Sequence, residues 1–154
     1  MEVARICYTM RDYDSAYKYY LQFLDLRKKQ HLDIFKNAEL TIAVVFSKTG
    51  HSERSEEFVK VFKKFADEDP TMYKNLHLAI YYIYRGDDKK AIEHLALFSR
   101  EDNYQYWVLL LQEDPLVDTI KERPEFRKVM KDIEEKFWRR NGEIRKNLEG
   151  KGLM

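Results

Sequence analysis

The residues that could carry chemistry are few and lie far apart in this chain. The four histidines, His31, His51, His77 and His94, include no pair spaced four residues apart, as a helical metal site requires. Cys7 is the single cysteine, and its place in the pattern described below predicts a small buried hydrophobic residue, not a nucleophile. The sequence therefore predicts no metal, no cofactor and no catalytic residue.

Carboxylates are abundant, but their arrangement favours a structural role. The densest run, Asp67, Glu68 and Asp69, precedes Pro70 at the expected end of a helix, where solvated side chains are the default. The sequence has neither a glycine-rich phosphate loop nor a G-x-S-x-G segment. An enzyme would need a deep pocket with convergent titratable groups, so we expect a protein without catalytic activity.

The chain is rich in tyrosine. Seven of its eleven tyrosines lie at residues 13–20 and 81–84. Neighbours such as Tyr19 and Tyr20 lie about 100° apart on a helix, so they cannot all point inward. Tyrosine combines a large apolar area with a polar tip, and it is enriched at protein interfaces. The alternative is that several tyrosines fill gaps between helices and keep their hydroxyls in water.

Composition narrows the class of protein further. The 154 residues suit one domain, and 28 Lys+Arg against 27 Asp+Glu give no overall charge for nucleic acid or an anionic membrane. No apolar run approaches the ~20 residues of a membrane span, and Arg5 and Arg11 interrupt the N-terminal segment where a signal peptide needs an apolar core. A single cysteine cannot form a disulfide within the chain, which is typical of proteins in a reducing compartment. We therefore expect a cytoplasmic protein.

Small residues recur at fixed spacing and define the elements. An alanine, a small residue twelve positions later and a phenylalanine seven positions beyond that occur three times, in copies that are 39 and 36 residues apart. The three copies are Ala4–Ala16–Phe23, Ala43–Ser55–Phe62 and Ala79–Ala91–Phe98. Such a period predicts stacked helix pairs, with small residues where two helix axes come closest. Asp12 is the expected N-cap of the second helix, and Thr49-Gly50 and Gly86-Asp87 are the expected turns within the later pairs.

The stretches LTIAVVFSKTGHSERSEEFVKVF and LHLAIYYIYRGDDKKAIEHLALF resemble the tetratricopeptide repeat (TPR), and ARICYTMRDYDSAYKYYLQF is a weaker third copy. The family's early tryptophan is absent, alanine replaces the glycine of its Leu-Gly step, and Ser55 replaces an alanine. The resemblance implies an all-α fold, an α-solenoid of about three TPR-like helical hairpins. By the family's usual boundaries the first helix is short, so we infer that Met1 begins a piece of a longer protein; a native short helix is the alternative.

The C-terminal part departs from the repeat. The segment NYQYWVLLL, from Asn103 to Leu111, predicts an apolar helix, and Pro124 suits the first position of a last long helix. Asn141-Gly142 interrupts its apolar stripe, which predicts a kink or a split. The stripe comprises Phe126, Val129, Met130, Ile133, Phe137, Ile144 and Leu148. The run DPLVDTIKERPEF resembles the segment that closes repeat regions in some bacterial transcriptional regulators, and a cap is its plain structural role.

We therefore expect TPR-like repeats over residues 1–100 and capping helices over 101–154, packed as one continuous domain. In a TPR-like stack the first helix of each pair lines a concave face, which the resemblance implies is apolar and aromatic here. The expected partner-binding residues of that face are Tyr8, Leu40, Val44, Tyr73, Leu76, His77, Ile80 and Tyr84. Such a face suits an internal apolar segment or a helix, either from a partner or from the same protein.

The sequence thus predicts a non-catalytic protein–protein or intraprotein interaction scaffold, with the sensor or regulatory region of a bacterial transcriptional regulator as the wider hypothesis. The alternative is nucleic-acid binding through the C-terminal helices, since residues 121–154 hold eleven Lys/Arg against seven Asp/Glu. Charge pairs such as Glu135 with Arg139 explain the same residues more plainly. The identity of the partner and any homo-oligomerisation are left open by the sequence.

Overall fold

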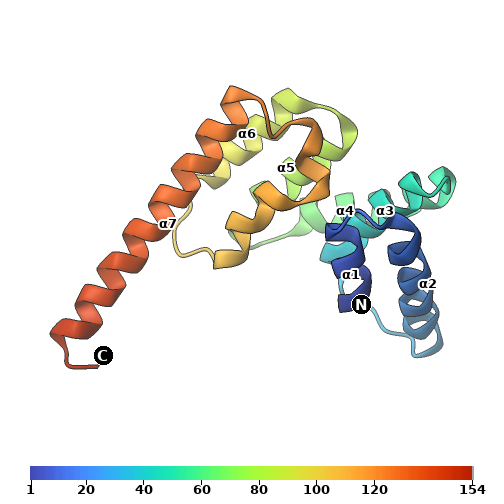
Figure 1. The fold of residues 1–154 in the computed structure, drawn as a ribbon, viewed down its shortest axis with the longest axis horizontal. Helices are drawn as coiled ribbons and strands as arrows, with labels where there is room; N and C mark the ends of the chain where they lie inside the picture. Colours follow the sequence, from blue (N-terminus) through green and yellow to red (C-terminus); the bar gives the residue numbers. More distant parts are fainter. Residues whose placement is uncertain (154) are drawn as a thin grey trace.

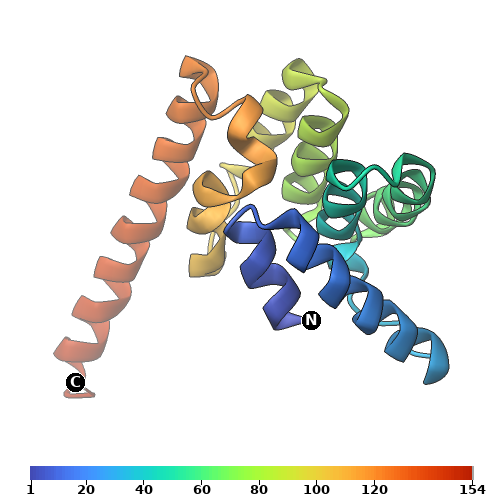
Figure 2. The same cartoon turned by 45° about the vertical axis from the view of Figure 1, so that its right-hand side comes forward.

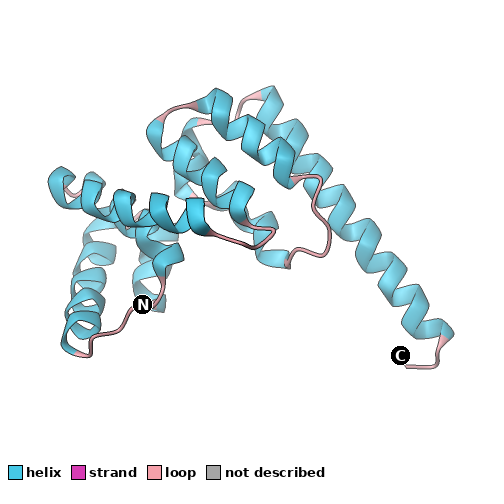
Figure 3. Cartoon of the chain, turned by 180° about the vertical axis from the view of Figure 1, so that it is seen from behind, coloured by secondary structure: helices cyan, strands magenta, loops and turns pink. Residues whose placement is uncertain are grey.

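The computed structural model describes residues 1–153, and every regular element in that range is a helix (Figure 3). None of the described helices combines the length and the apolar character needed to cross a membrane. The α-helices are α1 (Glu2–Thr9), α2 (Tyr13–Lys29), α3 (Glu39–Lys48), α4 (Ser52–Glu68), α5 (Lys74–Arg85), α6 (Asp88–Phe98) and α7 (Pro124–Gly150). Three 3₁₀ helices, η1 (Lys36–Ala38), η2 (Tyr106–Glu113) and η3 (Pro115–Thr119), complete the described elements.

The first six α-helices form three hairpins, as the sequence predicts. α1 packs mainly on α2, α3 on α4, and α5 on α6, and each hairpin contacts the next (Figures 1 and 2). The expected N-cap is confirmed, because the Asp12 carboxylate accepts a hydrogen bond from the Ser15 N–H at 3.1 Å. Asp87 caps α6 in the same way, through the Lys90 N–H at 3.2 Å. Gly50 and Gly86 turn two of the hairpins with positive φ angles of 84° and 72°.

The recurring small residues all lie inside the hairpin contacts, with at most 1% of their surface exposed. The serine that replaces an alanine in the second copy is fully hydrogen-bonded. The Ser55 hydroxyl donates to the Ala43 carbonyl at 2.7 Å, so the Tyr84 hydroxyl, 2.8 Å away, must donate to it. This chain of hydrogen bonds joins α3, α4 and α5, and it gives Ser55 a structural purpose that an alanine could not serve.

The buried apolar side chains form two cores. One comprises α1 to α4 with Leu78 of α5, and the other comprises α5, α6, η2, η3 and α7. Tyr82 and Leu116 pack against both cores. The packing is therefore continuous across residue 100, and the third hairpin shares its core with the C-terminal segment. Cys7, expected to be buried, lies half-buried at the edge of the first core.

The segment from Asn103 to Leu111 is not the α-helix that its apolar run predicts. It begins after Asn103, whose φ is 64°, and only Tyr106 to Glu113 is helical, as the 3₁₀ helix η2. Pro115 has no N–H and holds Asp114 in an extended conformation with ψ 129°, which ends η2 and starts η3. The backbone between these two points closes tight i→i+3 turns, and this alternative is common in short connecting segments.

The expected break at Asn141-Gly142 is also wrong, since α7 runs unbroken from Pro124, its first residue, to Gly150. No atom outside the helix lies within 4 Å of a Cβ built on Gly142, so its cost is helix propensity alone, about 1 kcal/mol. The second half of α7 extends away from the rest of the molecule (Figures 1 and 2). Of the expected stripe, Phe126, Met130 and Ile133 are buried, whereas Ile144 is 46% exposed.

Candidate interaction surface

The eight residues expected on a concave face do not form an open surface. Half of them have under a tenth of their surface exposed and belong to the two cores: Tyr8, Leu40, Val44 and Leu76. The other half are partly buried: Tyr73, His77, Ile80 and Tyr84. A bound partner could not reach the first four in this conformation, because other parts of the chain cover them.

Part of the cover is the chain's own η3 segment, which packs on α5 and whose preceding residue, Asp114, contacts Tyr8 of α1 (Figure 2). The Tyr8 hydroxyl donates a hydrogen bond to the Asp114 carboxylate, and the Leu116 N–H donates to the same oxygen at 2.8 Å. Burial raises the pKa of Asp114 above its ordinary value in spite of these donors, and burial also raises the pKa of Tyr8. The side chain of Leu116 fills the junction between the two cores.

An ion pair at the surface holds the same segment at its edge. The Arg11 guanidinium, in the turn after α1, donates to both carboxylate oxygens of Asp118 at 2.9 and 2.7 Å. Lys121 adds a third donor at 2.7 Å. These hydrogen bonds, that from Arg11 above all, lower the pKa of Asp118 to about 2. Residues more than a hundred positions apart are thereby joined beside the buried Tyr8–Asp114 contact.

Tyr73 anchors the beginning of the C-terminal segment. Its ring lies against Trp107, with ring centroids 5.1 Å apart, and against Phe98 at 6.2 Å. Its hydroxyl accepts a hydrogen bond from the Gln105 N–H at 3.2 Å. Two residues of the expected partner-binding set, Tyr8 and Tyr73, therefore bind successive parts of this same chain.

The histidine of the expected set has a structural environment. The His77 Nδ1 lies 2.7 Å from the Asp69 carboxylate, which also accepts a hydrogen bond from the Thr71 N–H at 2.8 Å. Burial lowers the pKa of His77 more than Asp69 raises it, so the neutral ring donates to the carboxylate. The ring also packs on Phe65, with centroids 4.9 Å apart. His77 thus fixes the connection between α4 and α5.

Two other histidines are likewise packed, and the described residues contain no cluster of three or more metal-ligating side chains. His51 stacks on Tyr17, with centroids 4.5 Å apart. His94 lies 3.0 Å from the Asn75 side-chain oxygen and stacks on Tyr82. Their surroundings account for these rings without a ligand.

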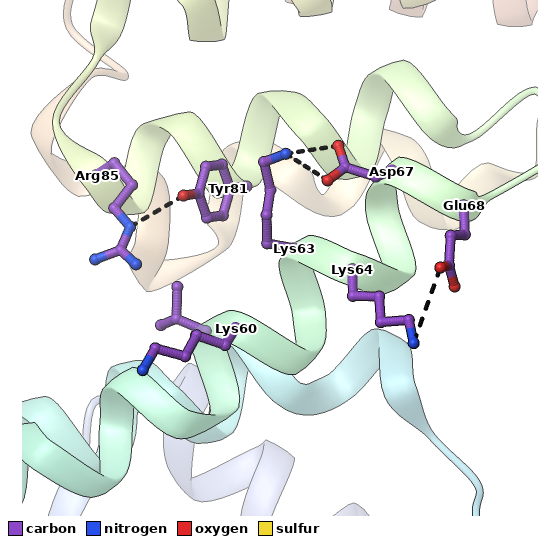
Figure 4. A pocket seen from close by; sticks show the side chains of 8 residues that line it. Lys60, Lys63, Lys64, Asp67, Glu68, Tyr81 and Arg85 are labelled. Carbon is purple, nitrogen blue, oxygen red and sulfur yellow. Dashed lines mark hydrogen bonds and ion pairs between the residues drawn. The ribbon is translucent and has the colours of Figure 1, made fainter.

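A hollow of ≈ 360 Å³ lies between α4 and α5 and is rimmed by charged residues (Figure 4). Three of its four cations are paired: Lys63 donates to Asp67 at 2.6 Å, Lys64 lies 4.0 Å from Glu68, and Arg85 binds Glu56 at 2.7 and 2.9 Å. Its lining residues include no serine, threonine, cysteine or histidine. The hollow offers a charged rim without the arrangement that acyl or phosphoryl transfer needs.

The basic C-terminal region is largely paired within the chain. Glu135, expected to pair with Arg139, instead lies 3.5 Å from Lys131. Further pairs are Arg123–Asp88, Arg127–Glu122, Lys136–Asp102, Arg140–Glu143 and Arg145–Glu149. These carboxylates reduce the positive field that a phosphate backbone would meet.

An exposed aromatic cluster, which the sequence analysis did not identify, lies where η2 meets α7. Tyr106 and Trp138 are each 53% exposed, and both contact Phe137, at centroid distances of 6.0 and 5.2 Å. Exposed aromatic clusters of this kind mark interaction surfaces. One sequence signal was available, because Trp138 directly follows Phe137 and so must point away from the buried stripe.

Comparisons with protein-family models, with curated proteins and with solved structures find no match to this chain.

Proposed function

We propose that this chain is a non-catalytic interaction scaffold, a TPR-like α-solenoid whose inner face binds an apolar chain segment. The observation that carries the proposal is the seating of η3: Tyr8 and Arg11 hold Asp114 and Asp118, and Leu116 fills the space between the cores. In this structure the segment that lies there is the chain's own.

A partner that uses the same face must compete with this tethered segment. An intramolecular ligand has a high effective concentration, so a free peptide of the same sequence binds only when the tethered copy is released. We propose that the occupant is exchanged between this segment and part of a partner protein, or of another domain of the same protein.

The wider role that we propose is the sensor or regulatory region of a bacterial transcriptional regulator, acting in the cytoplasm. Its support is the resemblance of the run DPLVDTIKERPEF alone. That run includes Asp114, Leu116 and Asp118, which contact Tyr8, both cores and Arg11 respectively.

The test releases the tethered segment and supplies it again as a peptide. The double variant Asp114→Ala, Leu116→Asp removes the buried acceptor and the central apolar contact. We expect it to bind a fluorescent peptide of residues 111–122 at least about tenfold more tightly than the unchanged protein does. The matched control is the same peptide carrying Leu116→Asp, which should not bind.

Circular dichroism establishes whether the double variant keeps its helices. A folded variant that does not bind the peptide would refute the proposal. Should the variant lose its helices, Asp118→Ala provides the second measurement, because this change removes only the surface ion pairs with Arg11 and Lys121. Peptide binding by Asp118→Ala that equals binding by the unchanged protein would then count against an exchangeable segment.

A further inference from the structure

The side of α1 opposite Tyr8 exposes three apolar side chains. Val3, Ile6 and Met10 are 49%, 57% and 74% exposed. They are spaced by three and four residues, which places them on one side of the helix. The outer face of a hairpin that ends a repeat stack is normally polar, so an apolar patch at this place indicates a surface that binds another element.

The repeat shows what covers the same positions elsewhere in the chain. Val3 precedes the recurring alanine of its copy by one position, and Ile6 follows that alanine by two. The residues at these positions are Ile42 and Val45 in the second copy, and Leu78 and Tyr81 in the third. The second copy therefore has the same two residue types as α1, in the reverse order.

In the later copies these positions pack on the hairpin that comes before. Ile42 and Val45 are fully buried in the first core, and α3 contacts both α1 and α2. Leu78 of α5 is buried in that first core and not in the core of its own hairpin, and Tyr81 packs against the first core as well. Of the three copies, only α1 has both positions exposed.

The contacts between hairpins define the kind of occupant, because the second helix of the preceding hairpin supplies side chains to them. The ring of Tyr17 on α2 lies against Phe46 of α3, with centroids 4.9 Å apart. Lys63 of α4 lies 5.4 Å from the centre of the Tyr81 ring of α5. A second copy of this chain offers no free helix of that kind within its described residues, since α3, α5 and α7 already pack on α2, α4 and α6. The occupant is therefore a hairpin of another protein whose second helix is open.

The edge of the exposed patch suits an apolar occupant. Glu2 and Arg5 beside it form an ion pair with each other at 2.6 Å, so neither brings an unpaired charge to the contact. Cys7 is half-buried at the position where α3 has the fully buried Phe46. The smaller side chain of Cys7 leaves room for a bulky residue of the occupant.

We propose that the side of α1 formed by Val3, Ile6 and Met10 docks a helical hairpin of a partner protein, as α3 packs on the first hairpin. The occupant presents an apolar second helix with a bulky side chain opposite Cys7, in the place that Tyr17 has opposite the ring of α3. This surface lies on the other side of α1 from Tyr8, so the proposal does not depend on the exchange of η3 at the inner face.

A stand-in for the partner hairpin tests the surface on the full chain. The stand-in is the chain's own first hairpin, residues 1–39, attached directly before Met1. This junction puts Val3 three positions after residue 39, where Ile42 stands in the unchanged chain. The attachment also gives the hairpin a high effective concentration, so that weak docking is still populated.

The thiol of Cys7 reports docking, because Cys7 is the single cysteine of the chain and lies beside the proposed contact. The attached copy carries Cys7→Ser, so that one thiol remains. We expect a maleimide reagent to modify Cys7 at least about tenfold more slowly in the fused chain than in the chain without the attachment, since covered thiols react slowly. Equal rates would overturn the proposal.

Substitution of Ile6 separates docking from a general effect of the attachment. Ile6→Ala in the original copy should lower the urea midpoint of the fused chain, where docking buries the side chain, and should leave the midpoint of the chain without the attachment almost unchanged. Val61→Ala, at a position 43% exposed on α4, is the matched control and should leave both midpoints unchanged. If Ile6→Ala has the same small effect in both chains, the proposed surface is wrong.

Sedimentation of the chain without the attachment tests the rival occupant, a second copy. We expect a monomer at micromolar concentrations, because two such chains present each other with no open second helix. A dimer that Ile6→Ser disperses would show that this side of α1 pairs with its own copy, and the proposal would then fail.

Discussion

The first half of α7, from Pro124 to Phe137, and the second half, from Trp138 to Gly150, share one spacing of apolar residues but have different neighbours. In the first half Phe126, Met130 and Ile133 are at most 1% exposed, against α6 and η2. In the second half Ile144 has no such cover. Amphipathic spacing therefore determines which face of a helix is apolar, whereas burial depends on another element packing on that face.

The loop after α6 packs on the first half of α7, through the two sets of hydrogen bonds that follow. Lys136 donates from Nζ to three backbone carbonyls, those of Ser99, Arg100 and Glu101, at 3.0, 2.8 and 2.9 Å. These lie at and beyond the C-terminus of α6, where unpaired carbonyls favour a cation. The buried Tyr104 hydroxyl then donates to the Ile133 carbonyl at 2.6 Å. The chain leaves α7 near this level, and Ile144 beyond it is 46% exposed.

The largest difference in stability is expected between alanine variants of two isoleucines on one face of this helix. Ile133→Ala opens a cavity in the second core and should lower the free energy of unfolding by about 2–4 kcal/mol. Ile144→Ala removes an exposed side chain and should change it by less than about 0.5 kcal/mol. Urea denaturation followed by circular dichroism measures both. A loss of similar size for Ile144→Ala would mean that the second half is covered in solution, by a second copy or by the chain itself.

A smaller difference in stability is expected between alanine variants of two lysines on the same helix. Lys136→Ala removes the cation that binds the end of α6, and it should cost about 1–2 kcal/mol in the same denaturation measurement. Lys146→Ala, which breaks no ion pair among the described residues, should be neutral. If both variants unfold at the same urea concentration, the boundary between the two halves does not depend on Lys136.

The sequence predicts the hairpins well because they depend on contacts that are local along the chain. The recurring residues Ala43 and Ser55 meet because they lie on consecutive helices, and Asp12 caps the helix that it precedes. Spacing and capping chemistry are therefore sufficient to predict both features.

The site is less accessible to sequence reasoning, because it depends on contacts between distant residues. Nothing near Tyr8 indicates that Asp114 will lie beside its hydroxyl, so the sequence predicts an open position for Tyr8, which is buried. Similarly, the apolar run after Asn103 has the composition of a buried helix, but the backbone before Asp114-Pro115 takes the 3₁₀ form. Residue types therefore predict an apolar face around Tyr8. They do not predict that residues 114–116 lie against it.

The stability that the Asp118 ion pair contributes should depend on pH. The pKa of Asp118 lies below its ordinary value of 3.8, at about 2, because Arg11 donates to it. A folded-state pKa that is lowered adds stability above the ordinary pKa, and this stability disappears as the pH falls through the lowered value. Asp118→Asn should therefore be less stable than the unchanged protein near neutral pH, and the difference should vanish towards about pH 2.

Urea denaturation of both proteins across this pH range measures the difference. Arg11→Gln should lose most of this acid-sensitive stability, and adding Asp118→Asn should remove only the remainder that the Lys121 hydrogen bond supplies. A difference between Asp118→Asn and the unchanged protein that stays constant with pH would show that the ion pair does not hold η3 in solution.

The smallest effect concerns Gly142, at which the sequence predicts a break in α7. Gly142→Ala meets no atom outside its helix, and it should favour the helical state locally by up to about 1 kcal/mol. If the second half of α7 frays independently of the cores, hydrogen exchange of amides 138–150 should slow while the urea midpoint stays unchanged. A midpoint raised by the full amount would show that the uncovered half unfolds together with the cores. The two halves of α7 would then be one cooperative unit that differs only in exposure.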